Sequence, residues 1–151
     1  MAWGSFGNGK LGWLVVLPQN TRMGTNSYMN ILKKALMPSL HQTGISVFMQ
    51  DGATCHTSRR SMAWLAKQGV PVLSWTGQSP DQNPIENLWR EWKRIIMTKF
   101  KPPKNLKELE GRMNLAWKLL SKRKDLLTNL CDSAQRRVEA LLEADGGFTK
   151  Y

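Results

Sequence analysis

The first third of the chain alternates short apolar runs with glycine-rich and helical patterns. Strand-like residues 2–6 and 11–17 flank residues 7–10, Gly-Asn-Gly-Lys, and this arrangement predicts a β-hairpin. From residue 26 onward, apolar side chains recur at i, i+3, i+4, i+7 and i+8. This spacing predicts one face of a helix that stops near Pro38.

The middle of the chain predicts two more strands with a short helix between them. Apolar, β-branched runs at residues 45–49 and 70–75 are typical of strands, and residues 58–67 have the pattern of a helix. Gly69 is placed to end that helix in a left-handed conformation. A turn-rich stretch at residues 76–82 follows.

The last part of the chain is helical in pattern. Apolar stripes predict helices over Pro84 to about Lys99, Leu106–Lys122 and Leu126–Ala144, with a break at residues 100–103, Phe-Lys-Pro-Pro. Three tryptophans, Trp89, Trp92 and Trp117, have core-facing spacing, so we interpret them as core and not as base-stacking platforms. Strands alternating with helices predict an α/β fold with helices packed on a small mixed sheet.

Composition adds a strong positive charge to this picture. The 151 residues include 22 Lys and Arg against 11 Asp and Glu, a net charge of +11. Such an excess favours a polyanionic partner, either nucleic acid or, less readily, an anionic membrane surface. The longest apolar run, residues 11–17, is too short to span a bilayer, so no membrane insertion is expected. Two Cys and two His at scattered spacings predict neither a disulfide framework nor a zinc site.

Two acidic residues lie where a site could form. Asp51 ends a predicted strand and Glu86 lies in the first turn of a predicted helix, with 34 residues between them. Each also has an ordinary structural explanation. Asp51-Gly52 is a common turn, and Glu86 is at the capping-box position after Asn83 and could pair with Arg90. Taken by themselves, these residues favour the structural roles.

Longer motifs around both acids resemble those of Tc/mariner transposases. Residues 50–58, Gln-Asp-Gly-Ala-Thr-Cys-His-Thr-Ser, resemble the family stretch QDNAPCHTS. Residues 78–89, Gln-Ser-Pro-Asp-Gln-Asn-Pro-Ile-Glu-Asn-Leu-Trp, with Lys93-Arg94 after them, resemble QSPDLNPIENLW…KR. The Trp-Gly segment near the start and residues 132–151 are also similar to family motifs, so the resemblance covers the whole chain.

The resemblance implies a ribonuclease-H-like catalytic domain with a triad of two Asp and a third Asp or Glu. By motif match, Asp51 would be the second member and Glu86 the third, and both would bind Mg²⁺ or Mn²⁺. Hard cations prefer carboxylate oxygen, and two such ions can activate water or a DNA 3′-hydroxyl. The implied activity is DNA strand cleavage and strand transfer in the nucleus. The implied partner is DNA. A homo-oligomer is the other expected partner, and it follows from unpaired sheet edges and not from the resemblance.

The chain departs from the family pattern at its beginning. In the family, the first triad Asp and the DNA-binding helices lie upstream of the hairpin, whereas residues 1–50 contain no Asp or Glu. We therefore expect residues 1–151 to form a partial catalytic domain, without the N-terminal DNA-binding domain and without the central first strand. Such a chain would not hold both metal ions. Its hairpin would dock poorly beside residues 45–49 and leave unpaired sheet edges.

The leading hypothesis is thus a truncated transposase catalytic domain that is inactive alone. One alternative is a nucleic-acid-binding module without chemistry, and another is an active Mg²⁺ nuclease that receives its missing Asp from a partner or an upstream segment. A basic cluster could follow a DNA backbone, although a solvated helix face explains it equally well. Its candidate residues are Arg90, Lys93, Arg94, Lys99 and Lys101. His56 fits a helix-start or packing role better than a ligand role.

Overall fold

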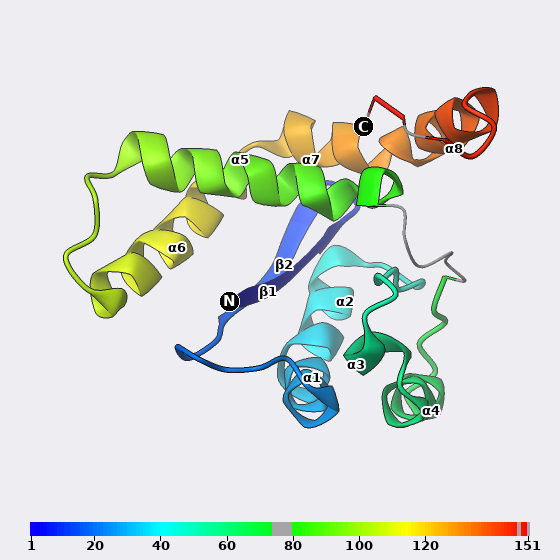
Figure 1. The fold of residues 1–151 in the computed structure, drawn as a ribbon, viewed down its shortest axis with the longest axis horizontal. Helices are drawn as coiled ribbons and strands as arrows, with labels where there is room; N and C mark the ends of the chain where they lie inside the picture. The colour runs from blue at the N-terminus through cyan, green and yellow to red at the C-terminus, as the bar shows by residue number, and fades with distance from the viewer. Residues whose placement is uncertain (74–79, 148, 151) are drawn as a thin grey trace.

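A β-hairpin lies between two groups of helices (Figure 1). The computed structural model describes residues 1–73, 80–147, 149 and 150. The hairpin consists of β1 (Ala2–Gly7) and β2 (Lys10–Val16). One group of helices comprises α1 (Thr25–Ile31), the π-helical turn η1 (Leu32–Leu36), α2 (Met37–Thr43), α3 (Thr54–Thr57) and α4 (Arg59–Lys67). The other comprises the 3₁₀ turn η2 (Pro80–Gln82), α5 (Pro84–Lys99), α6 (Leu106–Leu120), α7 (Lys124–Cys131) and α8 (Ser133–Glu143).

The hairpin forms where the sequence predicts it. Asn8 and Gly9 have φ values of 48° and 68°, which is the pair of positive angles that a tight hairpin turn requires. The two strands are antiparallel, and their register shifts between Gly4 and Phe6, as in a β-bulge.

The two faces of the hairpin contribute to two separate hydrophobic cores. Trp3 packs with the buried residues of the first core, whereas Leu11 packs with those of the second. The first core also contains Tyr28, Ile31, Leu32, Ala35, Leu36, Phe48, Cys55, Leu65 and Val70. The second also contains Leu88, Trp92, Ile95, Ala116, Trp117, Leu120, Leu127 and Leu130. The alternation of side chains across a strand places one face of the hairpin in each core.

Pro38 does not end the first helix, so that prediction is wrong. The helical backbone continues from α1 through η1 into α2 and ends at Gly44, which has a left-handed φ of 69°. Proline lacks the N–H that an α-helix would use and clashes with the carbonyl four residues back. Pro38 is the second residue of α2, which follows the wider π-helical turn η1, and proline is tolerated in the first turn of an α-helix.

The strands predicted at residues 45–49 and 70–75 are reduced to a single parallel bridge between Phe48 and Val72. The Phe48 N–H donates to the Pro71 carbonyl, and the Leu73 N–H donates to the Phe48 carbonyl, both at 2.8 Å. Strands depend on partners, and within the described residues neither segment has a second neighbour. Residues 74 and 75, and the predicted turn at residues 76–79, lie outside the described residues.

The hairpin does not pair with residues 45–49, as expected for a sheet without its central strand. Within the described residues, the sheet consists of two strands, β1 and β2. The predicted absence of pairing between the hairpin and residues 45–49 is therefore confirmed. The prediction that the hairpin docks poorly is wrong, because Trp3 and Leu11 are buried in the two cores and Ile45 packs against Gly7.

The predicted helix over Leu126–Ala144 is wrong in its continuity, because Asp132 divides it into α7 and α8. The Ser133 hydroxyl donates to the Leu130 carbonyl at 2.7 Å, so a side chain takes an acceptor that a continuous helix would use. The helices predicted at 58–67, 84–99 and 106–122 are present with ends that differ by at most two residues. No described helix has the length and apolar content needed to cross a bilayer.

Candidate active site

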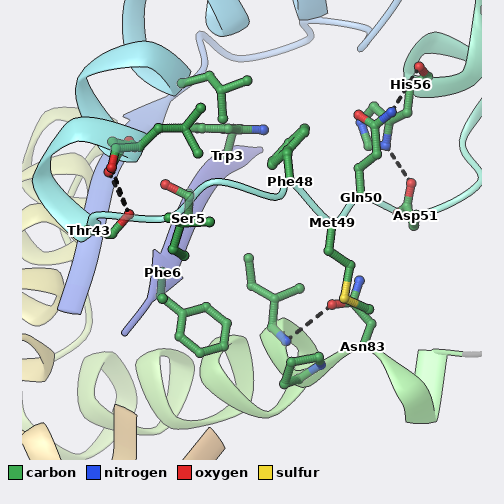
Figure 2. A pocket seen from close by; sticks show the side chains of 18 of the residues that line it. Trp3, Ser5, Phe6, Thr43, Phe48, Met49, Gln50, Asp51, His56 and Asn83 are labelled. Carbon is green, nitrogen blue, oxygen red and sulfur yellow. Dashed lines mark hydrogen bonds and ion pairs between the residues drawn. The ribbon is translucent and has the colours of Figure 1, made fainter. Parts of the chain in front are cut away.

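A cavity of about 720 Å³ is lined by β1, by residues 45–51 and by the beginning of α5 (Figure 2). At one end of the hairpin, the Ile45 side chain packs directly against Gly7. Its walls include the backbone of β1 on one side and Phe48, Met49 and Gln50 on the other. Both Asp51 and Glu86 line this cavity. The fold therefore brings the two predicted acids to one cavity from segments that are separated by 34 residues of sequence.

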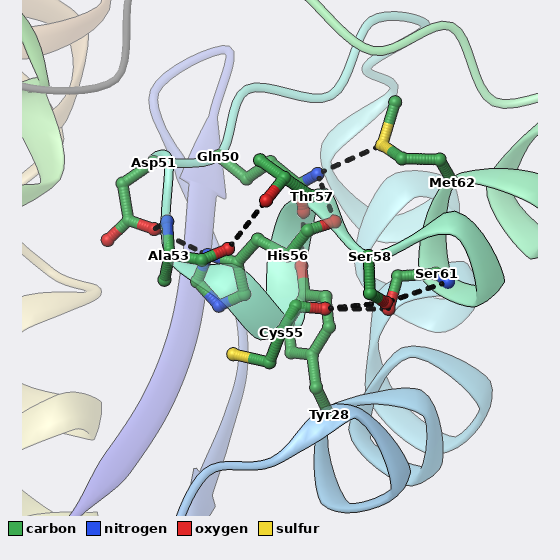
Figure 3. A network of polar contacts seen from close by, with 10 residues as sticks. All are labelled: Tyr28, Gln50, Asp51, Ala53, Cys55, His56, Thr57, Ser58, Ser61 and Met62. Atoms are coloured by element: carbon green, nitrogen blue, oxygen red, sulfur yellow. Dashed lines mark hydrogen bonds and ion pairs between the residues drawn. The ribbon is translucent and has the colours of Figure 1, made fainter.

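Asp51 is held on one side of its carboxylate. Its Oδ1 atom lies 2.5 Å from Nδ1 of His56 and accepts the Ala53 backbone N–H at 3.0 Å (Figure 3). The side chain of Asp51 is nevertheless 54% exposed. The carboxylate is thus oriented by two contacts and still accessible from solvent.

Glu86 is exposed in the first turn of α5, and its carboxylate is not used for capping. Asn83 caps the helix by accepting the Ile85 N–H at 3.3 Å. The Asn83 backbone N–H donates to the Pro80 carbonyl at 3.0 Å, so the expected capping-box exchange with Glu86 does not form. The expected pair with Arg90 is also absent among the described residues, since Arg90 donates to the Asn87 side chain at 2.8 Å.

The turn before α5 is anchored by the end of the chain. The buried guanidinium of Arg137 donates to the Asp81 carbonyl and, at 2.8 Å, to the Ser133 hydroxyl. The Thr149 hydroxyl donates to Asp81 Oδ2 at 2.7 Å, and this hydrogen bond holds the pKa of the Asp81 carboxyl below its usual range. Contacts from α8 and from the residues after it therefore fix the point where α5 begins.

The structure divides the predicted DNA-binding residues between different faces. An α-helix turns by about 100° per residue. Arg90 and Lys93 therefore lie within about 40° of Glu86 around the axis of α5, and both are exposed. Lys99 lies about 140° away by the same geometry. Only part of the predicted set shares a face with Glu86.

The remaining two candidates differ in their surroundings. Arg94 is exposed and pairs with Glu91 at 2.9 Å, and this contact lowers the pKa of Glu91 from its usual value. Lys101 is exposed and lies beyond the end of α5. Arg90 and Lys93 are consequently the cations best placed to meet a phosphate near Glu86.

The donor chemistry of the cavity fits a hard divalent cation in part. Asp51 and Glu86 offer carboxylate oxygens, which Mg²⁺ and Mn²⁺ prefer. Within the described residues, no three His, Cys, Asp or Glu side chains lie close enough to hold an ion together. The two carboxylates suit an ion that completes its shell with water and phosphate oxygens, and they fall short of a closed protein site.

Comparisons with known proteins agree with the motifs. The family described as DDE superfamily endonuclease matches residues 10–110, which include Asp51 and Glu86. The chain is 34% identical over 155 residues to the Tc1 transposase of Caenorhabditis elegans and 33% identical over 156 residues to the Tcb1 transposase of Caenorhabditis briggsae. Each alignment covers 100% of this chain and 54% of the relative. The chain thus spans about half the length of the curated relatives it matches.

Solved structures show the same fold. A structure of the Mos1 transposase catalytic domain with Raltegravir and Mn superposes with a TM-score of 0.85 at 15% identity, over 99% of this chain and 76% of that one. The Mos1 mariner paired end complex with Mn gives a TM-score of 0.82 at 15% identity, over 99% of this chain and 44% of that one. The predicted ribonuclease-H-like fold class is confirmed.

The chain belongs to the DDE superfamily of endonucleases, in which it is related to the catalytic domains of Tc/mariner transposases.

Sequence reasoning missed the residues that surround Asp51. His56 was expected only to start a helix or to pack, and it also contacts the Asp51 carboxylate. Its ring packs against Tyr28 with centroids 4.2 Å apart, so the packing role is confirmed. The available signal was the spacing of five residues between Asp51 and His56, which carries little weight without the backbone turn between them.

Proposed function

We propose that this domain acts in metal-dependent cleavage and transfer of DNA strands, with Asp51 and Glu86 as ligands of Mg²⁺ or Mn²⁺. The observation that carries the proposal is that both acids line one cavity while the family match spans both of their motifs. A bound divalent cation would supply a more acidic water or 3′-hydroxyl and would stabilise the departing oxygen of the phosphodiester.

The protein residues would orient the ion and the DNA. Asp51 has one oxygen engaged by His56 and Ala53, which leaves Oδ2 for a ligand. The carboxylate of Glu86 has no hydrogen bond or ion pair among the described residues, so nothing has to be broken before it binds. Arg90 and Lys93, on the same face of α5, would pair with DNA phosphates beside the site.

We further propose that residues 1–151 are inactive alone because a third acid is missing. Residues 1–50 contain no carboxylate side chain, and the cavity lies between the backbone of β1 and Phe48, Met49 and Gln50. An extended segment that entered this cavity would meet β1 on one side and Phe48 on the other. Such a segment, from a partner or from upstream of the hairpin, could bring the third carboxylate to Asp51 and Glu86.

Metal binding provides the primary test. The signal of free Mn²⁺ in electron paramagnetic resonance reports how much ion the folded chain binds. Asp51→Asn and Glu86→Gln should each weaken Mn²⁺ binding by more than about tenfold. Glu143→Gln is the matched control, because Glu143 is exposed on α8 and does not line the cavity. Equal Mn²⁺ affinity in all four proteins would refute the assignment.

A plasmid assay tests the inactivity of the chain. Supercoiled DNA incubated with the chain and Mn²⁺ should remain supercoiled. Nicking by the wild-type chain that disappears in Asp51→Asn would contradict the inactivity while supporting the metal ligands. Nicking should appear when an Asp-bearing strand precedes the hairpin.

A nucleic-acid-binding module without chemistry is the second candidate, and the exposed cations of α5 favour it. Gel-shift affinities over a salt series measure the number of phosphate contacts. Lys93→Gln should reduce the magnitude of the salt slope by about 1, whereas Lys99→Gln, on the opposite face of α5, should change it less. Equal effects of the two substitutions would contradict the proposed DNA-facing side.

Two further proposals follow from a DNA substrate and an open strand edge. Nuclear localisation is expected if the substrate is chromosomal DNA, and imaging of a tagged chain tests it. Self-association through the unpaired edge of β1, which faces the cavity, would be seen by analytical ultracentrifugation as a concentration-dependent mass.

A further inference from the structure

A chain of contacts connects the first hydrophobic core to the exposed Asp51. Tyr28 on α1 is 0% exposed and belongs to this core. Its hydroxyl donates to Gln50 Oε1 at 2.5 Å, and Gln50 Nε2 donates to the His56 carbonyl at 3.2 Å. The last contact is the one between the His56 ring and Asp51. Figure 3 shows that these side chains come from three neighbouring segments of the chain.

The ring of His56 is held in place by contacts other than the one with the Asp51 carboxylate. It packs against the Tyr28 ring at 4.2 Å with a tilt of 40° between planes, and its side chain is 17% exposed. Burial raises the pKa of the Tyr28 hydroxyl far above its usual range, so this group stays a neutral donor to Gln50. The backbone of His56 is held by Gln50 while its ring is held by Tyr28.

The contact between His56 and Asp51 has a defined direction. An ionised carboxylate only accepts hydrogen bonds, so Nδ1 of His56 carries the proton in this contact. Asp51 Oδ1 accepts hydrogen bonds from Nδ1 of His56 and from the Ala53 N–H, while in Figure 3 the other carboxylate oxygen points away from the network. An exposed aspartate without such partners would exchange among staggered χ1 rotamers.

We propose that His56 is a positioning residue that fixes the rotamer of Asp51 and leaves Oδ2 as the oxygen that binds a divalent cation. This inference rests on the proposed function for the identity of the ligand, but the fixed rotamer does not depend on it. Hydrogen bonds to a metal-ligating carboxylate orient it, and their removal costs about 10–100-fold in metal affinity. His56 thus acts on the ion through Asp51 and is not itself a ligand.

A packing role for His56 makes different predictions, and two substitutions separate them. His56→Phe keeps a ring against Tyr28 and removes the donor to Asp51. His56→Asn removes the ring and keeps an N–H at the same number of bonds from the backbone as Nδ1. If His56 positions Asp51, His56→Phe should release the Asp51 rotamer and weaken metal binding, and His56→Asn should preserve both. If His56 only packs, His56→Phe should preserve both and His56→Asn should lose both.

The first measurement uses the metal-free protein. Three-bond couplings from the backbone nitrogen and carbonyl carbon to Cγ of Asp51 report its χ1 rotamer by NMR. Wild type and His56→Asn should show one dominant rotamer, and His56→Phe should show averaged couplings. Averaged couplings in wild type, or a single rotamer in His56→Phe, would overturn the proposal.

The second measurement is Mn²⁺ affinity on the same three proteins. His56→Phe should bind about 10–100-fold more weakly than wild type, and His56→Asn should stay close to wild type. Wild-type affinity in His56→Phe would overturn the link from His56 to the ion. Absence of Mn²⁺ binding in wild type would refute the proposed function, and the coupling measurement would still decide whether His56 fixes Asp51.

Discussion

Gly4 on β1 lies so close to two indole rings that a methyl group added there should destabilise the fold. A Cβ atom at Gly4 would lie 2.8 Å from Cη2 of Trp89 and 2.9 Å from Cη2 of Trp117. These rings stack with centroids 5.5 Å apart, and the Trp117 indole N–H donates to the Gly12 carbonyl at 3.0 Å. A hydrogen-bonded indole stacked on a second ring in a packed core has little room to move.

The expected size of the effect combines two opposing contributions. Overpacking a core by a methyl-sized group costs typically about 1–3 kcal/mol. Replacing Gly by Ala reduces the entropy of the unfolded chain, which returns about 0.4–1 kcal/mol. The midpoints of these two ranges give a net loss for Gly4→Ala of about 1.3 kcal/mol in the free energy of unfolding.

Gly111→Ala is the matched control and should have the opposite sign. Gly111 is exposed within α6, and apart from its chain neighbours and the backbone of its own helix no atom lies within 4 Å of a Cβ built there. Alanine in a helix interior is favoured over glycine by about 0.8–1.0 kcal/mol. The same chemical change should thus stabilise the protein at one position and destabilise it at the other.

Urea unfolding followed by tryptophan fluorescence measures both effects. With a slope of about 2 kcal/mol/M, Gly4→Ala should lower the midpoint by about 0.6–0.7 M and Gly111→Ala should raise it by about 0.4–0.5 M. A midpoint for Gly4→Ala at or above that of wild type would refute the close packing of β1 against the tryptophans. A lowered midpoint for Gly111→Ala would refute the open surroundings assigned to that position.

The same unfolding assay and its pH dependence test two other features. Trp117→Phe leaves the Gly12 carbonyl without its donor and should cost about 1–3 kcal/mol, whereas Trp13→Phe, at a side chain that is 51% exposed, should stay within about 0.5 kcal/mol of wild type. Similar losses of stability in both variants would contradict a stabilising hydrogen bond from the buried Trp117 indole to the Gly12 carbonyl. The contact with Arg94 lowers the folded pKa of Glu91, so its stabilisation is present above the unfolded pKa and is lost as the pH falls through the folded value. Glu91→Gln should therefore lower thermal stability by a few tenths of a kcal/mol near neutral pH and leave it unchanged near pH 2, and a deficit that grows in acid would contradict the ion pair.

Features with a local cause were predictable from the sequence. Asn8-Gly9 requires only its own backbone angles to form a hairpin turn, and Asn83 caps α5 with its own side chain. Residues 45–49 have strand-forming side chains but form one bridge, because a strand also depends on a neighbour from elsewhere in the chain. Pro38 misled the prediction because the π-helical turn before it has no simple sequence signal.

The candidate site divides in the same way. The motifs around Asp51 and Glu86 indicated that the two acids share a site, and the structure places both on one cavity. The capping and pairing roles that local spacing favoured for Glu86 are not formed among the described residues. The contact between His56 and Asp51 depends on how α3 follows the turn at Ala53, so the spacing of residues could not reveal it.

The π-helical turn η1 also determines which face of α2 packs against the hairpin. Such a turn contains one residue more than the α-helical repeat needs. Deleting a residue from Leu32–Leu36 would rotate α2 by about 100° relative to α1 and move Ser39, whose hydroxyl accepts the Trp13 N–H at 2.9 Å, off β2. In a relative whose aligned sequence lacks one residue here, the helix that corresponds to α2 should present a different face to the hairpin. The hairpin of such a relative should carry compensating changes opposite Ser39.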